Sequence, residues 1–300
     1  MALNRSNKYP GRFLAPTAAR PQGAFKNRTS PTAQDGSYLE ADWANDWDGF
    51  FARILTVAGV TPNGNVDSGT ASQLYDALLS AMPGRLIKIT VFTENGTFTA
   101  QNTTKKIRVR GVGTGGTGAG SAAVSSANVS CLSGGASAGW AEAIYESAFS
   151  SIPVTVGMQG AKGYGNGGPG GQSSFGSLMV IPGGSGGVAN SRAASEIYYE
   201  NGGVDADIPV ISGQSSGYVV RGSGGERGKV LSGFSSSGKG GDTPYGPGGK
   251  GRAATSGASF PGFDGNGYGS GGGGAAAASS SSQVYGGFGM RGIFIVEEYA

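Results

Sequence analysis

The chain has 300 residues, a net charge of +3 and 14% charged residues, so its charge gives little support to nucleic acid as a partner. No apolar run approaches the roughly 18 residues of a membrane span, and no signal-peptide core follows the first residues, so we expect no membrane insertion. With no histidine and one cysteine, Cys131, the usual metal ligands and the commonest general base are missing. We therefore expect no metal, no cofactor, no catalytic residue, and folding in a reducing cytoplasm.

Glycine is distributed unevenly, with nine residues in the first 110 positions and 51 in the rest of the chain. Ordering glycine costs more backbone entropy than ordering any other residue, so such a region folds by close backbone approach, depends on partner chains, or stays disordered. Apolar blocks such as 178–181 and 293–296 recur between the glycine runs. We expect short strands joined by glycine loops. Polyproline II helices packed side by side are the alternative, and the spacing of Gly157, Gly160 and Gly163 favours them locally.

Residues 1–36 form a basic, proline-containing segment that cannot bury a core alone, and we expect an extended arm. Six basic residues precede the first acidic one, Asp35. Three interpretations stay open: a solvated tail, an arm that orders on an acidic surface of a partner, and a nucleic-acid contact. In the second, the anchoring candidates are Arg5, Tyr9, Arg12, Phe13 and Phe25.

Residues 37–84 are predicted to form two helices. Residues 37–40 (Ser-Tyr-Leu-Glu) match a capping box, Gly59 ends the first helix, and Thr70 with Gln73 repeats the cap before a helix that stops at Pro83. The first helix carries an apolar stripe too large for two helices to bury between them. We expect this stripe to pack against copies of itself or a partner. Its candidate interface residues are Trp43, Trp47, Phe50 and Ile54.

From residue 85 onward, apolar and polar residues alternate with the period of a strand, and Asn95-Gly96 predicts a hairpin turn. Further strands are predicted at 140–146, 152–156, 177–181, 208–211, 218–220 and 293–298. Short strands in this number predict a mainly β chain, in which residues 85–300 form a glycine-rich, sandwich-like β domain.

The order of several sequence blocks is also familiar. The segments 92–98 and 107–113 are followed by Gly139-Trp140-Ala141-Glu142, Val154-Thr155-Val156-Gly157, Gly171-Gln172-Ser173-Ser174-Phe175-Gly176, Gly183-Gly184-Ser185-Gly186-Gly187 and Val296-Glu297-Glu298-Tyr299. Over residues 90–300 this order resembles the glycine-rich distal domain of bacteriophage tail fibres, and residues 63–78 resemble the proximal part of short fibre proteins. The chain departs from that pattern at 119–132, where an Ala/Ser stretch replaces a longer glycine run.

The resemblance implies a host-recognition protein at the tail of a virion, usually a homotrimer. Its partners would be copies of itself, a phage tail or baseplate protein, and a receptor on the bacterial surface, either a polysaccharide or an outer-membrane protein. The protein would be made in the host cytoplasm and would reside in the virion.

Residues 188–283 carry extra material between the familiar blocks, and we expect exposed side chains there to contact the receptor. Aromatic rings can stack on sugars or enter apolar clefts, and cations can bind phosphate or acidic sugars. The alternative for each aromatic residue is packing between glycine loops, and Phe175 and Phe288 fit that structural role. The candidates for receptor binding are Tyr245, Phe260, Phe263, Tyr268, Lys239, Lys250 and Arg252.

Other functions find less support. Residues 233–240 nearly match a phosphate-binding loop, but Gly240 replaces the hydroxyl residue that would hold Mg²⁺. Asp205 and Asp207 could share one face of a strand as a glycosidase pair does, which keeps a polysaccharide-depolymerase tailspike as the alternative function. A glycine-rich RNA-binding protein is disfavoured because no Arg-Gly-Gly triplet occurs.

Overall fold

A computed structural model describes residues 5–21, 23–37, 41–82, 84–147, 149–200, 202 and 204–300. The chain is mainly β and divides into two compact units, residues 1–83 (unit 1) and 84–300 (unit 2). Within the residues that the structure describes, no helix has the length and apolar character needed to cross a membrane.

The N-terminal segment of unit 1 is less extended than expected. It contains helix α1 (Arg5–Lys8) and a hairpin of strands β1 (Phe13–Leu14) and β2 (Ala24–Phe25). Phe13 is buried, its ring centroid lies 5.1 Å from that of Phe25, and Phe25 in turn lies 5.7 Å from Trp43. The aromatic residues of the segment therefore pack onto the first long helix.

Both predicted helices are present, as α2 (Ala41–Ala58) and α3 (Gln73–Ala81). Helix α2 ends before Gly59, whose φ of +68° favours glycine. The capping box at 37–40 extends into residues outside the described ranges. The Ser37 hydroxyl accepts a hydrogen bond from the Lys26 N–H at 2.9 Å and donates to the Arg12 carbonyl at 2.6 Å. This hydroxyl therefore joins parts of the N-terminal segment.

The cap predicted at Thr70 is wrong, because Ser72 caps α3. Its hydroxyl accepts from the Tyr75 N–H at 3.0 Å. The Asp67 carboxylate accepts hydrogen bonds from the N–H groups of Gln73 and Leu74, and it also accepts a hydrogen bond from the Ser72 hydroxyl at 2.7 Å. A carboxylate from outside the helix thus satisfies free N–H groups of the first turn. The cap lies two residues later than the sequence predicts.

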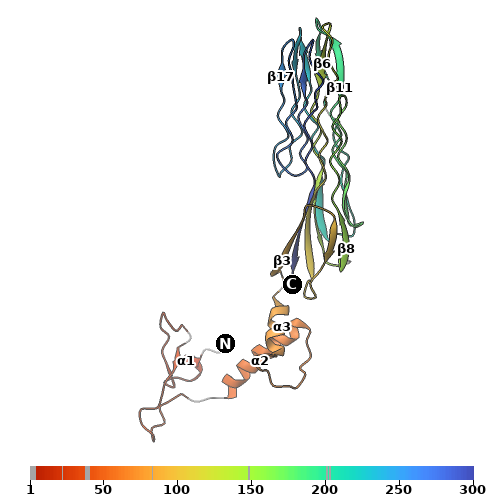
Figure 1. Cartoon of the computed structure of the whole chain (residues 1–300). Helices are drawn as coiled ribbons and strands as arrows, with labels where there is room; N and C mark the ends of the chain where they lie inside the picture. Colours follow the sequence, from red (N-terminus) through yellow and green to blue (C-terminus); the bar gives the residue numbers. More distant parts are fainter. Residues whose placement is uncertain are drawn as a thin grey trace. The chain divides into compact units, whose positions relative to one another are not determined.

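The part of unit 2 that holds the C-terminus is a sandwich of two antiparallel sheets (Figure 1). The first sheet has the order β14 (Ser216–Val220), β7 (Trp140–Tyr145), β5 (Lys106–Val112), β20 (Ile293–Tyr299), β3 (Leu86–Phe92). The second has the order β13 (Val210–Ile211), β10 (Met179–Ile181), β9 (Ser173–Phe175), β8 (Ser151–Thr155), β4 (Gly96–Thr99). Phe98, Phe175 and Phe294 are fully buried in the core between the sheets, so the structural role expected of Phe175 is confirmed.

The hairpin predicted at Asn95-Gly96 is wrong. Strand β3 pairs with β20, whereas β4 pairs with β8 in the other sheet, so the chain crosses between sheets here. The Asn95 side-chain oxygen accepts from the Val156 N–H at 2.8 Å. The asparagine therefore holds the crossing segment against the second sheet.

Between the sandwich and the far end of unit 2, the glycine-rich segments run side by side without forming strands (Figure 1). The N–H groups of residues 115–121 donate in strict rotation to three other segments, 284–290, 133–136 and 165–168. Every third N–H therefore faces the same neighbour, which is the geometry of a polyproline II helix with three residues per turn. The polyproline II alternative is confirmed, and it replaces the expected glycine loops.

Only glycine permits this spacing at the contact points. A Cβ added to Gly116 would lie less than 3.0 Å from the Ser185 carbonyl oxygen, and one added to Gly272 would lie equally close to the Gly287 carbonyl oxygen. Both obstacles are backbone atoms of neighbouring helices in the bundle. The missing side chain is thus a condition for the inter-helix hydrogen bonds.

Three small sheets lie at the end of the bundle away from the sandwich (Figure 1). One pairs β6 (Asn128–Leu132) with β11 (Ala189–Ala193), and another pairs β18 (Ser259–Phe260) with β19 (Ala276–Ala277). The third has the order β12 (Ile197–Tyr199), β15 (Lys229–Leu231), β16 (Phe234–Ser236), β17 (Ala253–Ala254). Sequence patterns predicted none of these strands, because small residues such as those of 119–132 give no clear alternation. Cys131 is buried there with Val129 and Val230.

We expect Gly116→Ala to destabilise unit 2 by about 2–3 kcal/mol, because the backbone that a Cβ would meet cannot move without breaking neighbouring hydrogen bonds. Thermal or urea unfolding followed by circular dichroism measures the change. Gly165→Ala is the matched control, since a Cβ there has open space. Equal stability of the two variants would contradict the close-packed bundle.

Burial raises the pKa of the Cys131 thiol from 9.0 to about 11. The folded protein therefore keeps the thiol protonated where the unfolded chain ionises it, and we expect the free energy of unfolding to fall as the pH rises from 9 to 11. Urea titrations at several pH values measure this slope. Cys131→Ala should show a shallower slope, and identical slopes would refute the assignment.

Candidate binding surface

Three of the expected binding residues gather on the outside of the bundle. Phe260 ends β18, and Phe263 follows three residues later, on the same side of a threefold helix. The guanidinium carbon of Arg252 lies 4.0 Å from the ring centroid of Phe263 and 5.8 Å from that of Phe260. Both rings are more than 40% exposed. The cation thus covers part of each aromatic face and leaves the remainder open to solvent.

A second cation–aromatic pair lies on the neighbouring helix of the bundle. The Lys162 ammonium lies 3.8 Å from the ring centroid of Phe288 and 3.0 Å from a carboxylate oxygen of Asp264. Asp264 also accepts from the Phe288 N–H at 2.7 Å. The Gly265 N–H donates to the Phe288 carbonyl, which places this pair beside the segment that carries Phe263.

Two tyrosines lie beside these cation–aromatic pairs. The rings of Tyr164 and Tyr285 stack with centroids 4.3 Å apart and an interplanar angle of 21°. Tyr285 precedes Phe288 by three residues, so the two side chains share one side of their helix. We name this surface the aromatic–basic face. It consists of Lys162, Tyr164, Arg252, Phe260, Phe263, Tyr285 and Phe288.

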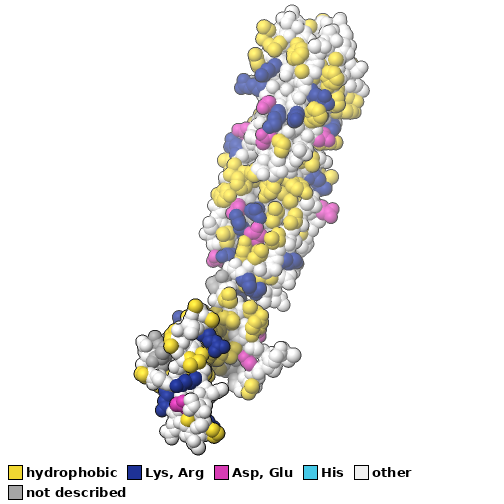
Figure 2. Space-filling view, turned by 90° about the vertical axis from the view of Figure 1, so that its left-hand side faces the viewer, with side chains coloured by type: hydrophobic (Ala, Val, Ile, Leu, Met, Phe, Trp, Pro, Cys, Tyr) yellow, Lys and Arg dark blue, Asp and Glu magenta, His cyan; other side chains and the backbone are white. Residues whose placement is uncertain are grey.

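Figure 2 looks onto the side of the molecule where Figure 1 draws β17. On unit 2, hydrophobic side chains occur there in separate groups, with basic and acidic side chains between them. A surface of this kind offers ring faces and isolated cations to a ligand.

The other four candidates for receptor binding lie apart from this face. Tyr245 is half-buried against Val112 and Ile293 of the sandwich, and burial raises the pKa of its hydroxyl. Tyr268 is partly exposed, in a turn that lies next to the turn containing Tyr245. The Thr243 hydroxyl donates a hydrogen bond to the backbone carbonyl of Tyr268.

The two lysines among those four are also outside the aromatic–basic face. The Lys239 ammonium forms an ion pair with Asp242 at 2.6 Å. Lys250 is exposed and lies two residues before Arg252, which belongs to the face. The structure therefore brings together three of the seven expected residues.

Sequence reasoning missed four members of the face. The sequence pattern around Phe288 predicts a structural role, but the side chain is only half-buried and lies under Lys162. The spacing of three between Tyr285 and Phe288, repeated by Phe260 and Phe263, is the signal that could have identified them. The contributions of Lys162 and Tyr164 depend on long-range packing that no local pattern reveals.

Neither of the two sequence patterns considered for catalysis, the pair Asp205 and Asp207 and the loop 233–240, has the local structure predicted for it. Asp205 and Asp207 are exposed and lie outside any strand, with the buried Ala206 between them, so the shared strand face predicted for a carboxylate pair is wrong. Residues 233–240 begin in the turn between β15 and β16 and enter the glycine bundle, and no helix follows within 204–300. A phosphate-binding loop needs a helix at that point.

Two of the five expected anchoring residues of unit 1 have polar contacts within the unit. The Tyr9 hydroxyl donates to Asp42 at 3.3 Å, and the Arg12 guanidinium donates to the Gln34 carbonyl. Phe13 is buried, and Phe25 is partly exposed beside Trp43. The side chain of Arg5 lies outside the described part of the chain.

The expected interface residues lie along α2. Trp43 and Ile54 are half-buried, whereas Trp47 and Phe50 are exposed. None of the 18 residues of α2 is buried, although the helix carries two tryptophans and two phenylalanines. Unit 1 therefore leaves much of an aromatic stripe in contact with solvent.

Among the described residues, no group of three or more acidic or cysteine side chains is arranged to hold a metal ion. No curated protein matches the chain. The model of the glycine-rich domain family matches residues 91–299, which span both the sandwich and the bundle, and the chain therefore belongs to the glycine-rich domain family.

Proposed function

We propose that this protein is a virion tail-fibre adhesin that attaches to a phage tail or baseplate through unit 1 and binds a bacterial surface receptor through unit 2. The observation that supports receptor binding best is the aromatic–basic face. In this face, exposed aromatic rings with cations beside two of them line up across adjacent helices of one bundle, so several groups able to contact a ligand stand close together.

The bundle suits presentation of a binding surface. Its backbone N–H groups are bonded between segments distant in sequence, so the side chains that leave its surface stand on a rigid base. Rigid anchors lose little entropy when they bind a ligand, because the backbone is already ordered. Surface side chains can also change without disturbing the glycine contacts, which suits a protein whose receptor varies.

The chemistry of the face fits polysaccharide or an outer-membrane protein. Ring faces of Phe263 and Tyr285 can stack on sugars or on apolar side chains. Lys162 and Arg252 can contact phosphate, acidic sugars or carboxylates at the edge of such a ligand. The two kinds of receptor share this chemistry, and binding experiments on cells and on isolated components separate them.

Unit 1 suits self-association. The exposed stripe of α2 would be covered if three copies packed their helices together, and a homotrimer would present three copies of the aromatic–basic face. Multivalent binding of this kind raises effective affinity by roughly 10² to 10⁴ without tighter individual contacts. Attachment to the tail would then use the remaining surface of unit 1.

We expect Phe263→Ala and Arg252→Ala each to weaken binding to bacterial cells by about tenfold, because each removes one half of an exposed cation–aromatic pair. Labelled protein is applied to a panel of bacterial strains, and the variants are compared on the strains that bind. Tyr199→Ala is the matched control, since Tyr199 is an exposed ring paired with Lys229 outside the face. Binding to no strain, or equal binding by all variants, would contradict the proposal.

We expect the unaltered protein to have the mass of three chains in size-exclusion chromatography with light scattering. The double substitution Trp47→Glu with Phe50→Glu should reduce it to one chain, because it places charges in the proposed interface. Val66→Glu is the control, as Val66 is 96% exposed in unit 1 and outside the helices. A monomeric unaltered protein would rule out the trimer.

A further inference from the structure

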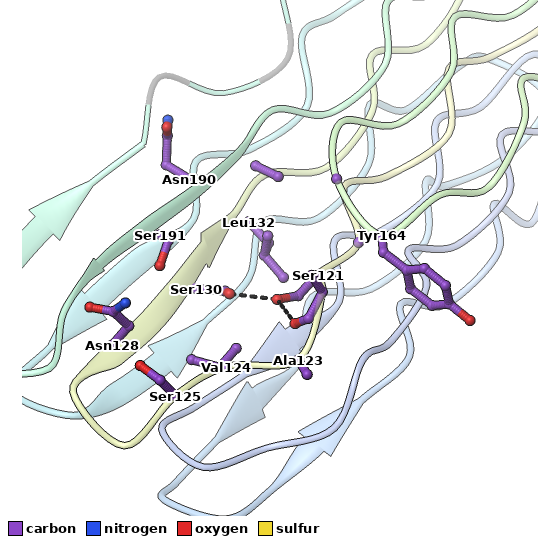
Figure 3. A pocket seen from close by; sticks show the side chains of 14 residues that line it. Ser121, Ala123, Val124, Ser125, Asn128, Ser130, Leu132, Tyr164, Asn190 and Ser191 are labelled. Atoms are coloured by element: carbon purple, nitrogen blue, oxygen red, sulfur yellow. Dashed lines mark hydrogen bonds between the residues drawn. The ribbon is translucent and has the colours of Figure 1, made fainter.

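The end of unit 2 away from the sandwich contains a cavity of about 310 Å³ (Figure 3). Its floor is the sheet of β6 and β11, and its walls are the segment 120–125 and the loop around Tyr164. The volume is at the lower end of the range of small-molecule sites, which is roughly 300–1,000 Å³. It is therefore large enough for a small ligand or one unit of a polymer.

The lining of this cavity is polar but uncharged. None of its 14 lining residues is an aspartate, glutamate, lysine or arginine, and the polar side chains are hydroxyls and amides. An ionic ligand would meet no opposite charge in this lining. The cavity therefore suits an uncharged ligand better than phosphates, carboxylates or ammonium groups.

Strand pairing explains how charge is kept out. Ser130 pairs with Ser191, and Asn128 lies two residues from Ser130, so these three side chains share one face of the sheet. Asn190 projects to the opposite side, where its amide donates to Glu200 (Figure 3). The Glu200 carboxylate that Asn190 contacts is thus behind the floor of the cavity.

Some of the polar groups are already paired and others are available. The hydroxyls of Ser121 and Ser130 are 2.6 Å apart, and Ser121 donates to the Ala122 carbonyl at 2.8 Å. In the described structure, by contrast, no hydrogen bond occupies the side chains of Ser125, Asn128 or Ser191. Around one small cavity they supply two hydroxyls and one amide, each able to donate and to accept.

The stacked tyrosines are next to this cavity. Tyr164 is one of its lining residues, and its ring extends outward from the edge (Figure 3) to stack on Tyr285 of the aromatic–basic face. A ligand that emerges from the cavity would therefore meet an exposed aromatic surface. Sugar rings match both parts, because their hydroxyls both donate and accept and their C–H faces stack on aromatic rings.

We propose that this cavity binds one uncharged sugar unit of a glycan, with Ser125, Asn128 and Ser191 bonding its hydroxyls and Tyr164 contacting the next unit. The inference rests on the proposed function, since the glycan would belong to the bacterial surface. It adds the ligand class, a neutral saccharide, and a site apart from the segments that carry Arg252 and Phe260.

The test measures binding of the full-length protein to an array of immobilised neutral and acidic oligosaccharides. We expect binding to one or more neutral glycans and at least about tenfold weaker binding after Asn128→Ala, which removes a hydrogen-bonding partner of the ligand. Ser191→Tyr should abolish binding by filling the cavity. Asn102→Ala, an exposed asparagine between β4 and β5 of the sandwich, is the matched control and should bind normally.

Cell binding distinguishes the two proposals. If the protein binds cells but binds no neutral glycan, or binds glycans equally well after Asn128→Ala and Ser191→Tyr, the saccharide site is refuted and the adhesin function stands. Preference for acidic glycans also refutes the site. Binding to neutral glycans without binding to any bacterial strain refutes the adhesin function and leaves the site supported.

Discussion

The contact between glycine Cα atoms and backbone carbonyls of neighbouring helices is the constraint on which unit 2 depends. A polyproline II helix has no internal hydrogen bonds, so each N–H must find a partner on another segment. In the bundle, N–H groups of residues 115–121 reach three different segments. A side chain at Gly116 or Gly272 would separate those segments and break the bonds on both sides.

This arrangement is costly in entropy and has little apolar burial of its own. Ordering a residue costs about 1–2 kcal/mol, whereas a hydrogen bond contributes about 0.5–1.5 kcal/mol net, so the bonds alone do not offset the cost. Apolar cores at both ends of the bundle add stabilisation. One is the sandwich core around Phe175 and Phe294, and the other is the cluster around Leu132 and Val284 near the small sheets. The glycine segments are therefore held at both ends.

The same geometry determines which side chains reach a ligand. Positions three apart share a side of each helix, so Phe260 with Phe263 and Tyr285 with Phe288 form parallel rows on adjacent segments. Glycine occupies the inward positions and the outward ones are free to vary. Recognition residues on such a bundle come from several distant parts of the chain, and Lys162 and Asp264, 102 residues apart, are an example.

Sequence patterns predicted the elements whose signal is local. The alternation in β5, β7 and β20 identified those strands, and Arg252, Phe260 and Phe263 stood out as aromatic and basic residues among glycines. The hairpin prediction at Asn95-Gly96 is wrong because the choice of strand partner depends on the two-sheet core and not on turn preference. The polyproline II bundle could be only an alternative, because the spacing of three at Gly157, Gly160 and Gly163 is interrupted at Gly165 and Gly167. The cavity was missed because its residues come from four segments of small side chains.

The cavity and the aromatic–basic face impose different requirements on one ligand, and Tyr164 belongs to both. The exposed side chains of Ser125, Asn128 and Ser191 make directional hydrogen bonds, so they distinguish ligands whose hydroxyls match their positions from ligands whose hydroxyls do not. Exposed rings with adjacent cations discriminate weakly, because stacking tolerates many partners and exposed charges are screened by salt. A glycan spanning both would be selected by its unit in the cavity and retained by contacts along the face. Substitutions in the cavity would therefore change which glycans bind, while substitutions on the face would change how tightly all of them bind.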